Sequence, residues 1–193
     1  MVENTEWLTE NRTIFLTGPI DEESVVPAMQ LIVQSNIEDK VTKETLQSYE
    51  PLPIKIFISS NGGDVYTAWG LIDLIETSDT PIFTYCVGGA MSAAFDIFIA
   101  GHSRFITEHS ILMCHQISSQ LSYMTVKDIQ EQNRWLQYLQ RECDKFIQNH
   151  TTLSKEDIKD ITRYKKDRYF TANDAIEFGM ADRIIDNSIL WSC

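Results

Sequence analysis

Residues 81–95 read Pro-Ile-Phe-Thr-Tyr-Cys-Val-Gly-Gly-Ala-Met-Ser-Ala-Ala-Phe, and this stretch constrains the fold more than any other. The pattern predicts a buried strand that passes through Gly88 and Gly89 and places Ser92 in the first turn of a helix. A helix N-terminus offers unpaired N–H groups and a partial positive charge, which stabilise an oxyanion forming beside it. Ser92 is therefore a candidate nucleophile, although a small-residue helix packed tightly on a sheet would give the same local pattern.

Composition narrows the class of protein. The 193 residues, 43% of them hydrophobic, predict one globular domain over residues 1–193. A net charge of −12 argues against nucleic acid as a partner. The sequence has no run of about 18 apolar residues, so it predicts no membrane-spanning helix. The N-terminal residues are acidic and lack the pattern of a signal peptide.

The cysteines indicate the compartment. Cys86 and Cys114 lie in apolar, strand-like runs, which predicts buried free thiols in a reducing, cytoplasmic setting. The four cysteines are scattered, and no Cys-x-x-Cys or His/Cys cluster has metal-ligand spacing. The sequence therefore predicts neither a metal nor an organic cofactor.

Strand and helix patterns alternate along the chain, which predicts an α/β layered fold with a mainly parallel sheet. A helical pattern covers residues 23–36, and the polar stretch 37–53 is interpreted as a loop or a short extra helix. Asp64 is a plausible N-cap for the next helix. A long helix is expected from about 125 to 150, with an apolar stripe made of Ile129, Leu136, Leu139, Cys143 and Ile147. The short strands are expected at 13–16, 54–58, 104–107 and 111–114.

Two further residues complete a possible hydrolytic site. His115 ends an apolar strand where a loop begins, and histidine is the usual base for activating a serine. Asp167 precedes a short aromatic strand and a capped helix at 171–179. A hydrolytic serine needs a base and an anion that orients the base, so Ser92, His115 and Asp167 together supply all three roles. Taken singly, His115 and Asp167 are more often structural residues.

The motifs then resemble, in one colinear order over about residues 12–186, the ClpP-type serine peptidases of the crotonase-like superfamily. The matching segments are Phe-Leu-Thr-Gly-Pro-Ile-Asp at 15–21, Ile-Ser-Ser-Asn-Gly-Gly at 58–63, Cys-Val-Gly-Gly-Ala-Met-Ser at 86–92, Met-Cys-His-Gln at 113–116, Lys-Asp-Arg-Tyr-Phe-Thr-Ala at 166–172 and Glu-Phe-Gly at 177–179. The resemblance implies Ser92 as nucleophile, His115 as general base, Asp167 as orienting acid, and the N–H groups of Gly63 and Ala93 as oxyanion donors.

The resemblance also implies an assembly. It implies two stacked heptameric rings that enclose a chamber, joined through the long helix as a handle, in which peptide bonds of unfolded polypeptides and peptides are hydrolysed. A Clp-type ATPase is the partner that it suggests, and it implies no cofactor.

Several positions depart from the family pattern. Only about a dozen residues precede the first expected strand, and Lys55 stands where many members have an aromatic residue of the ATPase docking pocket. Asn61 replaces a proline, residues 37–53 resemble an insertion, and Ile-Ser-Ser-Gln-Leu at 117–121 replaces a proline- and glycine-rich strand.

Asp96 departs most, because the family usually has an apolar residue there. It lies four residues after Ser92, on the same helical face. Asp96 either makes a polar contact with a neighbouring segment or subunit, or favours the protonated form of His115 and opposes the developing oxyanion. The second interpretation predicts that Asp96→Ala shifts the acidic limb of the rate profile to lower pH.

Other classes of function remain open from the sequence. A weakly active or structural ClpP-like subunit of a mixed ring would share most of these motifs, and a phage-type capsid-maturation peptidase would share the fold. A crotonase-type acyl-CoA enzyme would also use two backbone N–H groups, but it would leave the co-occurrence of Ser92, His115 and Asp167 unexplained. Membrane signal-peptide peptidases use a serine–lysine pair and an anchor, and neither is visible here.

Overall fold

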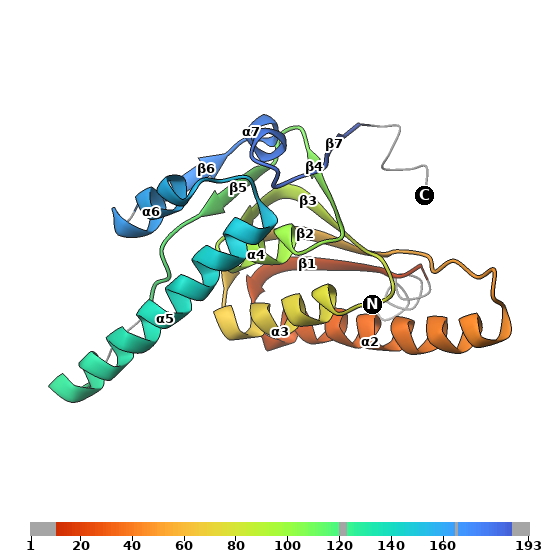
Figure 1. Ribbon diagram of the computed structural model, residues 1–193, viewed down its shortest axis with the longest axis horizontal. Helices are drawn as coiled ribbons and strands as arrows, with labels where there is room; N and C mark the ends of the chain where they lie inside the picture. The colour runs from red at the N-terminus through yellow and green to blue at the C-terminus, as the bar shows by residue number, and fades with distance from the viewer. Residues whose placement is uncertain (1–10, 120–122, 165, 187–193) are drawn as a thin grey trace.

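The computed structural model describes residues 11–119, 123–164 and 166–186. Seven strands of this described chain form one sheet (Figure 1). They are β1 (Thr13–Ile20), β2 (Ile54–Gly63), β3 (Ile82–Met91), β4 (Ser103–Thr107), β5 (Ile111–Cys114), β6 (Arg168–Phe170) and β7 (Arg183–Ile185). The helices between them are α2 (Glu22–Thr45), α3 (Val65–Glu76), α4 (Ala93–Ile99), α5 (Val126–His150), α6 (Lys155–Arg163) and α7 (Ala172–Glu177).

The sheet is mainly parallel, as predicted. Its strand order is β1-β2-β3-β4-β7, and all four of these pairings are parallel. Beyond this path, β5 pairs in parallel with the end of β3 and antiparallel with β6. Because helices connect β1 to β2, β2 to β3 and β3 to β4, the arrangement is a layered α/β fold.

The two faces of the sheet differ. Alternate residues of β2, Ile54, Ile56 and Ile58, are fully buried in the core, where α4 packs against β2 and β3. The helices α2 and α3 lie on that side of the sheet (Figure 1). On the other face, the rings of Phe15, Phe57, Tyr85 and Phe105 stack in a row across β1 to β4, with centroids 4.6–5.1 Å apart.

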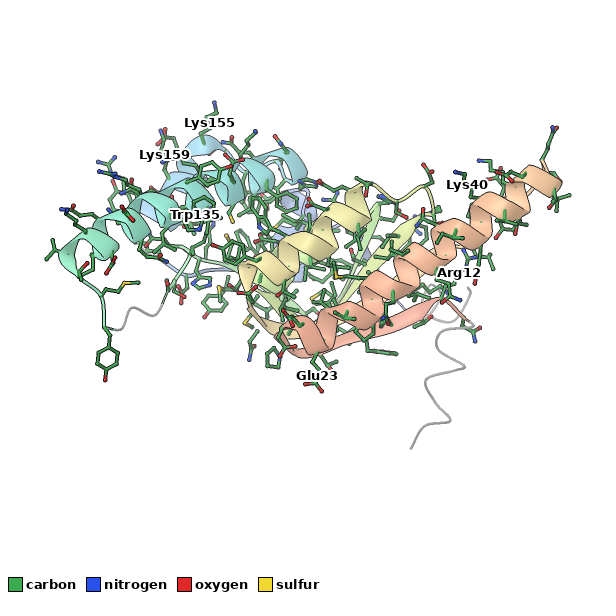
Figure 2. The ribbon with its side chains drawn as sticks, turned by 90° about the horizontal axis from the view of Figure 1, so that it is seen from below. Arg12, Glu23, Lys40, Trp135, Lys155 and Lys159 are labelled. Carbon is green, nitrogen blue, oxygen red and sulfur yellow. The ribbon has the colours of Figure 1, made fainter. Side chains whose placement is uncertain are left out.

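The predicted end of the first helix at residue 36 is wrong. Helix α2 continues to Thr45, so about its last two and a half turns occupy the stretch interpreted as a loop or a short extra helix. The polar residues there are mostly exposed on one unbroken helix, and Lys40 marks this half in Figure 2. Polar composition in this stretch therefore reflects solvent exposure and not a break in the helix.

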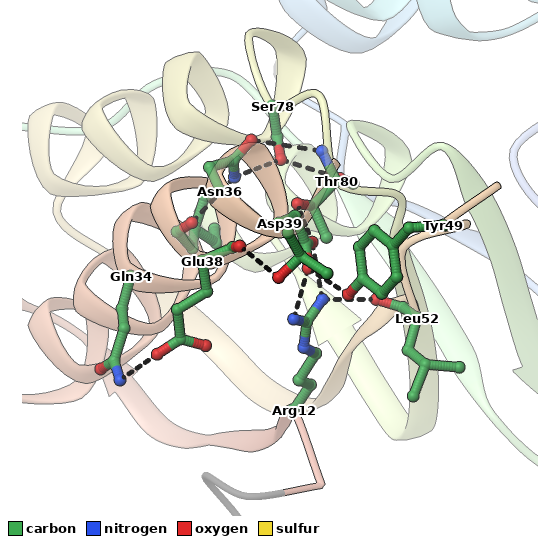
Figure 3. A network of polar contacts seen from close by, with 11 residues as sticks. Arg12, Gln34, Asn36, Glu38, Asp39, Tyr49, Leu52, Ser78 and Thr80 are labelled. Carbon is green, nitrogen blue, oxygen red and sulfur yellow. Dashed lines mark hydrogen bonds and ion pairs between the residues drawn. The ribbon is translucent and has the colours of Figure 1, made fainter. Parts of the chain in front are cut away.

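A buried polar cluster fixes this half of α2 to the sheet (Figure 3). The Asp39 carboxylate accepts hydrogen bonds from the Arg12 guanidinium at 2.6 and 2.7 Å, from Tyr49 Oη at 2.5 Å and from Thr80 Oγ at 2.6 Å. One turn earlier, the Asn36 side chain bonds to Ser78 and to the N–H groups of residues 79 and 80. The helix, the start of β1 and the segment before β3 are thus joined by charge-assisted hydrogen bonds.

The long helix is confirmed, but its expected stripe is only partly buried. Leu139, Cys143 and Ile147 of α5 are buried, whereas Ile129 is 45% exposed because the N-terminal half of α5 projects away from the body (Figure 1). Thr125 caps this helix in a reciprocal bond with Asp128. In the part of the chain that the structure describes, no helix combines the length and the apolar character needed to cross a membrane.

Candidate active site

Ser92 lies in a sharp turn between β3 and α4. Its φ of 53° and ψ of −127° are rare for a residue other than glycine. Hydrogen bonds fix this backbone: the Ser92 N–H donates to the Met113 carbonyl at 2.9 Å, and the Ser92 carbonyl accepts from the N–H groups of Phe95 and Asp96. Strained conformations of this kind persist only where the surroundings hold them, and they cluster at functional sites.

The end of β2 lies directly against this turn. A Cβ added to Gly62, whose φ is +93°, would lie 2.6 Å from the Met91 carbonyl oxygen and 2.7 Å from Ser92 Cβ. The approach is therefore possible only for glycine. Gly63 follows and lines the same cavity as Ser92 and Ala93. Because Ala93 is the first residue of α4, its N–H has no acceptor within the helix. The oxyanion role of Gly63 and Ala93 stays a prediction.

His115 contacts Ser92 directly. It follows the last residue of β5, and the pairing of Met91 with Met113 brings this end of β5 alongside Ser92. The Nε2 atom of His115 lies 2.7 Å from Ser92 Oγ, which is hydrogen-bond distance. Two of the three predicted side chains are thus together in the arrangement that a nucleophile and its base require.

Asp167 lies opposite His115 but does not bond to it. The antiparallel register of β5 and β6 pairs Leu112 with Phe170 and Cys114 with Arg168, so His115 and Asp167 come next in the same register. The Asp167 side chain is exposed, and within residues 11–119, 123–164 and 166–186 no hydrogen bond joins its carboxylate to His115. The orienting role of Asp167 stays a prediction.

The sequence did not predict the wall that α5 contributes to this cavity. Leu139, Gln140, Cys143 and Ile147 face Ser92 and His115 across a cavity of about 210 Å³. The amide oxygen of Gln140 accepts the N–H of Ile117 at 2.8 Å, which holds the segment after His115 against α5. The helical apolar stripe was the only sequence signal for this wall, and such a stripe does not specify what it packs against.

Asp96 also lines the cavity, next to two thiols. Burial raises the pKa of Asp96 to about 7. Burial likewise raises the pKa of Cys143 to about 12 and the pKa of Cys114 well above its usual range, and the nearby charge of Asp96 adds to both shifts. Cys86, Cys114 and Cys143 are buried free thiols, as predicted for the first two. The expected influence of Asp96 on His115 stays a prediction.

The described residues contain no group of three or more His, Cys, Asp or Glu side chains placed as metal ligands. The site therefore consists of a serine, a histidine, backbone N–H groups and a cavity that leads to Asp96.

Comparison with known proteins agrees with these observations. The model of the Clp protease family matches residues 1–188. The ATP-dependent Clp protease proteolytic subunit 4 of Rhodococcus jostii is 30% identical over 182 residues, which cover 92% of this chain and 86% of the relative. The ATP-dependent Clp protease proteolytic subunit 2 of Frankia casuarinae is 32% identical over 183 residues, which cover 92% of this chain and 77% of the relative. The chain, with its mainly parallel α/β sheet and Ser92 beside His115, belongs to the Clp protease family.

Proposed function

We propose that this protein is a serine endopeptidase that hydrolyses peptide bonds of unfolded proteins and peptides. The observation that carries the proposal is the 2.7 Å contact between His115 Nε2 and Ser92 Oγ at the mouth of a cavity. A serine hydroxyl is a weak nucleophile unless a base accepts its proton, and a neutral imidazole at this distance is such a base.

The steps follow from the positions of the groups. His115 Nε2 takes the proton of Ser92 Oγ while the oxygen attacks the scissile carbonyl carbon. The N–H groups of Gly63 and Ala93 stabilise the resulting oxyanion, each contributing about 3–4 kcal/mol by analogy with donors of this kind. The protonated His115 then gives its proton to the leaving amine. Water attacks the acyl-serine ester with His115 again as base, which releases the acid and restores Ser92.

Asp167 has the third role in this proposal. Its carboxylate would accept the proton on His115 Nδ1, which fixes the tautomer that leaves Nε2 free to act as base. The register of β5 and β6 supports this role, because its continuation by one residue beyond Cys114 and Arg168 pairs His115 with Asp167.

We also infer the assembly and the partner. The projecting half of α5, with its exposed apolar residues, supports a handle between two stacked heptameric rings that enclose a proteolytic chamber. A Clp-type ATPase would deliver unfolded polypeptide to that chamber. The names of the two relatives, which call them ATP-dependent Clp protease proteolytic subunits, support an ATP-dependent partner. Lys55 lies on the sheet face that carries the stacked rings of Phe15, Phe57, Tyr85 and Phe105, and it would alter how an ATPase docks there. A cytoplasmic location agrees with the buried free thiols.

The second candidate is a weakly active or structural subunit of a mixed ring. The observation that favours it is the exposed Asp167, whose carboxylate forms no hydrogen bond with His115 among the described residues. A serine–histidine pair without its orienting acid loses about 10⁴-fold in rate. In this case full activity would require a neighbouring subunit to bring the Asp167 carboxylate into contact with His115.

Labelling with a fluorophosphonate, which reacts with activated serines, tests both candidates. We expect the purified full chain to be labelled, Ser92→Ala to lose the label, and the exposed-site control Ser48→Ala to keep it. Light scattering on the same samples gives the assembly mass. A ring-sized mass without labelling of Ser92 would contradict the active peptidase and favour the structural subunit.

A further inference from the structure

A carboxyl group lines the cavity beside Ser92. The same cavity is lined by Ser92, Ala93 and His115, by Asp96 of α4, and by residues of α5. The Asp96 N–H donates to the Ser92 carbonyl at 3.2 Å, which fixes the first turn of α4 against the backbone of Ser92. When a substrate is acylated on Ser92, the side chain next to its carbonyl carbon can enter the cavity that Asp96 also lines.

The Asp96 carboxyl has no hydrogen-bond or ion-pair partner within residues 11–119, 123–164 and 166–186, although the residue is only 8% exposed. The described residues contain no buried side-chain oxygen that lacks a partner, so the oxygens of Asp96 are accessible from the cavity that this residue lines. A ligand that enters the cavity can therefore reach the carboxyl and pair with it.

The charges around Asp96 select a cation. The thiols of Cys114 and Cys143 lie near it and carry no positive charge. The cation that acts on Cys114 is Arg168, which is already paired with Asp157 at 2.9 Å. Asp96 is thus left without a compensating charge in the part of the chain that the structure describes.

Part of the wall suits an aliphatic stem. The apolar residues that line the cavity include Phe95, Leu136, Leu139 and Ile147, beside polar residues such as Gln132 and Gln140. A long side chain with a methylene stem and a charged tip would bury its stem against these residues and present its cation to Asp96. Lysine and arginine are the two amino acids with this form.

We propose that the cavity is the specificity pocket of the peptidase, and that it takes the lysine or arginine side chain on the acyl side of the scissile bond, with the cation paired to Asp96. This inference rests on the proposed function. It assigns the substrate class that the same site prefers, and Asp96 is a specificity-determining residue that contacts substrate.

Matched peptides test the proposal on the unmodified full chain. Their sequence is constant except for the acyl-side residue, which is lysine, arginine or norleucine, the last being lysine without its charged nitrogen. We expect kcat/KM to be at least tenfold higher for lysine than for norleucine. Equal kcat/KM values for the two peptides, or a higher value for norleucine, would overturn the inference. Because this experiment uses the unmodified chain, its outcome does not depend on whether a variant folds.

Two variants assign the preference to Asp96. Asp96→Asn keeps the shape of the side chain and removes its charge, so we expect the ratio of kcat/KM for the lysine peptide to that for the norleucine peptide to fall at least tenfold. Asp73→Asn makes the same change at an exposed position on α3 and should leave the preference unchanged. A lysine preference that survives in Asp96→Asn would overturn the assignment.

Covalent reagents separate this inference from the proposed function. Labelling of Ser92 is followed by mass spectrometry with three reagents: an uncharged fluorophosphonate and two peptide phosphonates that carry an aminobutyl or a butyl side chain. We expect the aminobutyl reagent to react at least tenfold faster than the butyl one. Labelling by the fluorophosphonate with no aminobutyl advantage would overturn the inference and leave the proposed function standing. Failure of all three to label Ser92 would overturn both.

Discussion

At the scale of single residues, the site depends on a serine in a conformation that serine rarely adopts. The positive φ of Ser92 turns the chain sharply out of β3, so that Oγ meets His115 Nε2 while the next N–H lies at the start of α4. Holding a residue in such a region costs about 1–3 kcal/mol. Backbone bonds to Met113, Phe95 and Asp96 offset this cost, and Gly62 leaves the space that the turn needs.

The pH dependence of substrate preference follows from Asp96. Burial raises its pKa to about 7, so the carboxyl is mostly neutral at pH 6 and mostly ionised at pH 8. Only the ionised form attracts a cationic side chain. We expect the ratio of kcat/KM for the lysine peptide to that for the norleucine peptide to rise between pH 6 and pH 8, by about tenfold at most.

The ratio isolates Asp96 from the other groups that face the cavity. Both peptides meet the same catalytic groups, so effects on the chemical step cancel in the ratio. Burial raises the pKa of Cys143 to about 12 and the pKa of Cys114 well above its usual range, so both thiols stay neutral between pH 6 and pH 8. Burial also raises the pKa of Asp144 on α5. The Asp96→Asn variant retains Asp144, so it is the control for any effect of Asp144 on the ratio. The same rise of the ratio in Asp96→Asn would contradict the prediction.

At the scale of elements, the Asp39 carboxylate joins the second half of α2 to the segments that precede β1 and β3. Burial would raise the pKa of Asp39, but the hydrogen bonds from Arg12, Thr80 and Tyr49 outweigh burial and lower the pKa to about 2. The folded pKa lies below the unfolded one, so this group stabilises the fold above about pH 4, and the contribution is lost as pH falls towards 2. The shift corresponds to about 2 kcal/mol.

We expect Asp39→Asn to lower the free energy of unfolding by about 3 kcal/mol at pH 7, because it leaves the Arg12 guanidinium without its partner. The deficit should shrink by about 2 kcal/mol between pH 5 and pH 2, where wild-type Asp39 becomes protonated. Urea unfolding at several pH values measures both quantities. The control Asp160→Asn, at an exposed position on α6, should stay within about 0.5 kcal/mol of wild type. A deficit that does not change with pH would contradict the role of the Asp39 charge.

Elements with a strong local signal were predictable, and those defined by tertiary contacts were not. The strand at 111–114 and the cap at Asp64 follow directly from apolar runs and capping chemistry. The end of α2 was misjudged because Asn36 and Asp39 look like surface residues in the sequence, whereas most of their partners lie 27–44 residues away. The separation of the Asp167 carboxylate from His115 and the enclosure of Asp96 by α5 likewise depend on packing between distant segments, which no local pattern records.

At the scale of the whole molecule, α5 has two different halves. Its C-terminal half packs on the core through Leu139, Cys143 and Ile147, and there it walls the cavity. Its N-terminal half projects beyond the body of the protein, with Trp135 on its flank (Figure 2). Ile129, Trp135 and Tyr138 are 44–46% exposed there. A helix of this kind gains most of its stability from packing, so the exposed apolar residues support a second copy of the chain as the partner of this half.

The proposed assembly of two stacked heptameric rings gives this surface a test. We expect Ile129→Asp to reduce the mass in solution from that of fourteen chains to that of seven, because a charge in the handle contact would separate the rings while each ring stays joined through other surfaces. Gln137→Asp introduces the same charge at another exposed position of α5 without removing apolar surface, and it should keep the full mass. Light scattering measures both variants at equal concentration, and circular dichroism checks that α5 stays helical. If Ile129→Asp has the same mass as Gln137→Asp, the projecting half of α5 does not join the rings, and its apolar residues must face a different partner.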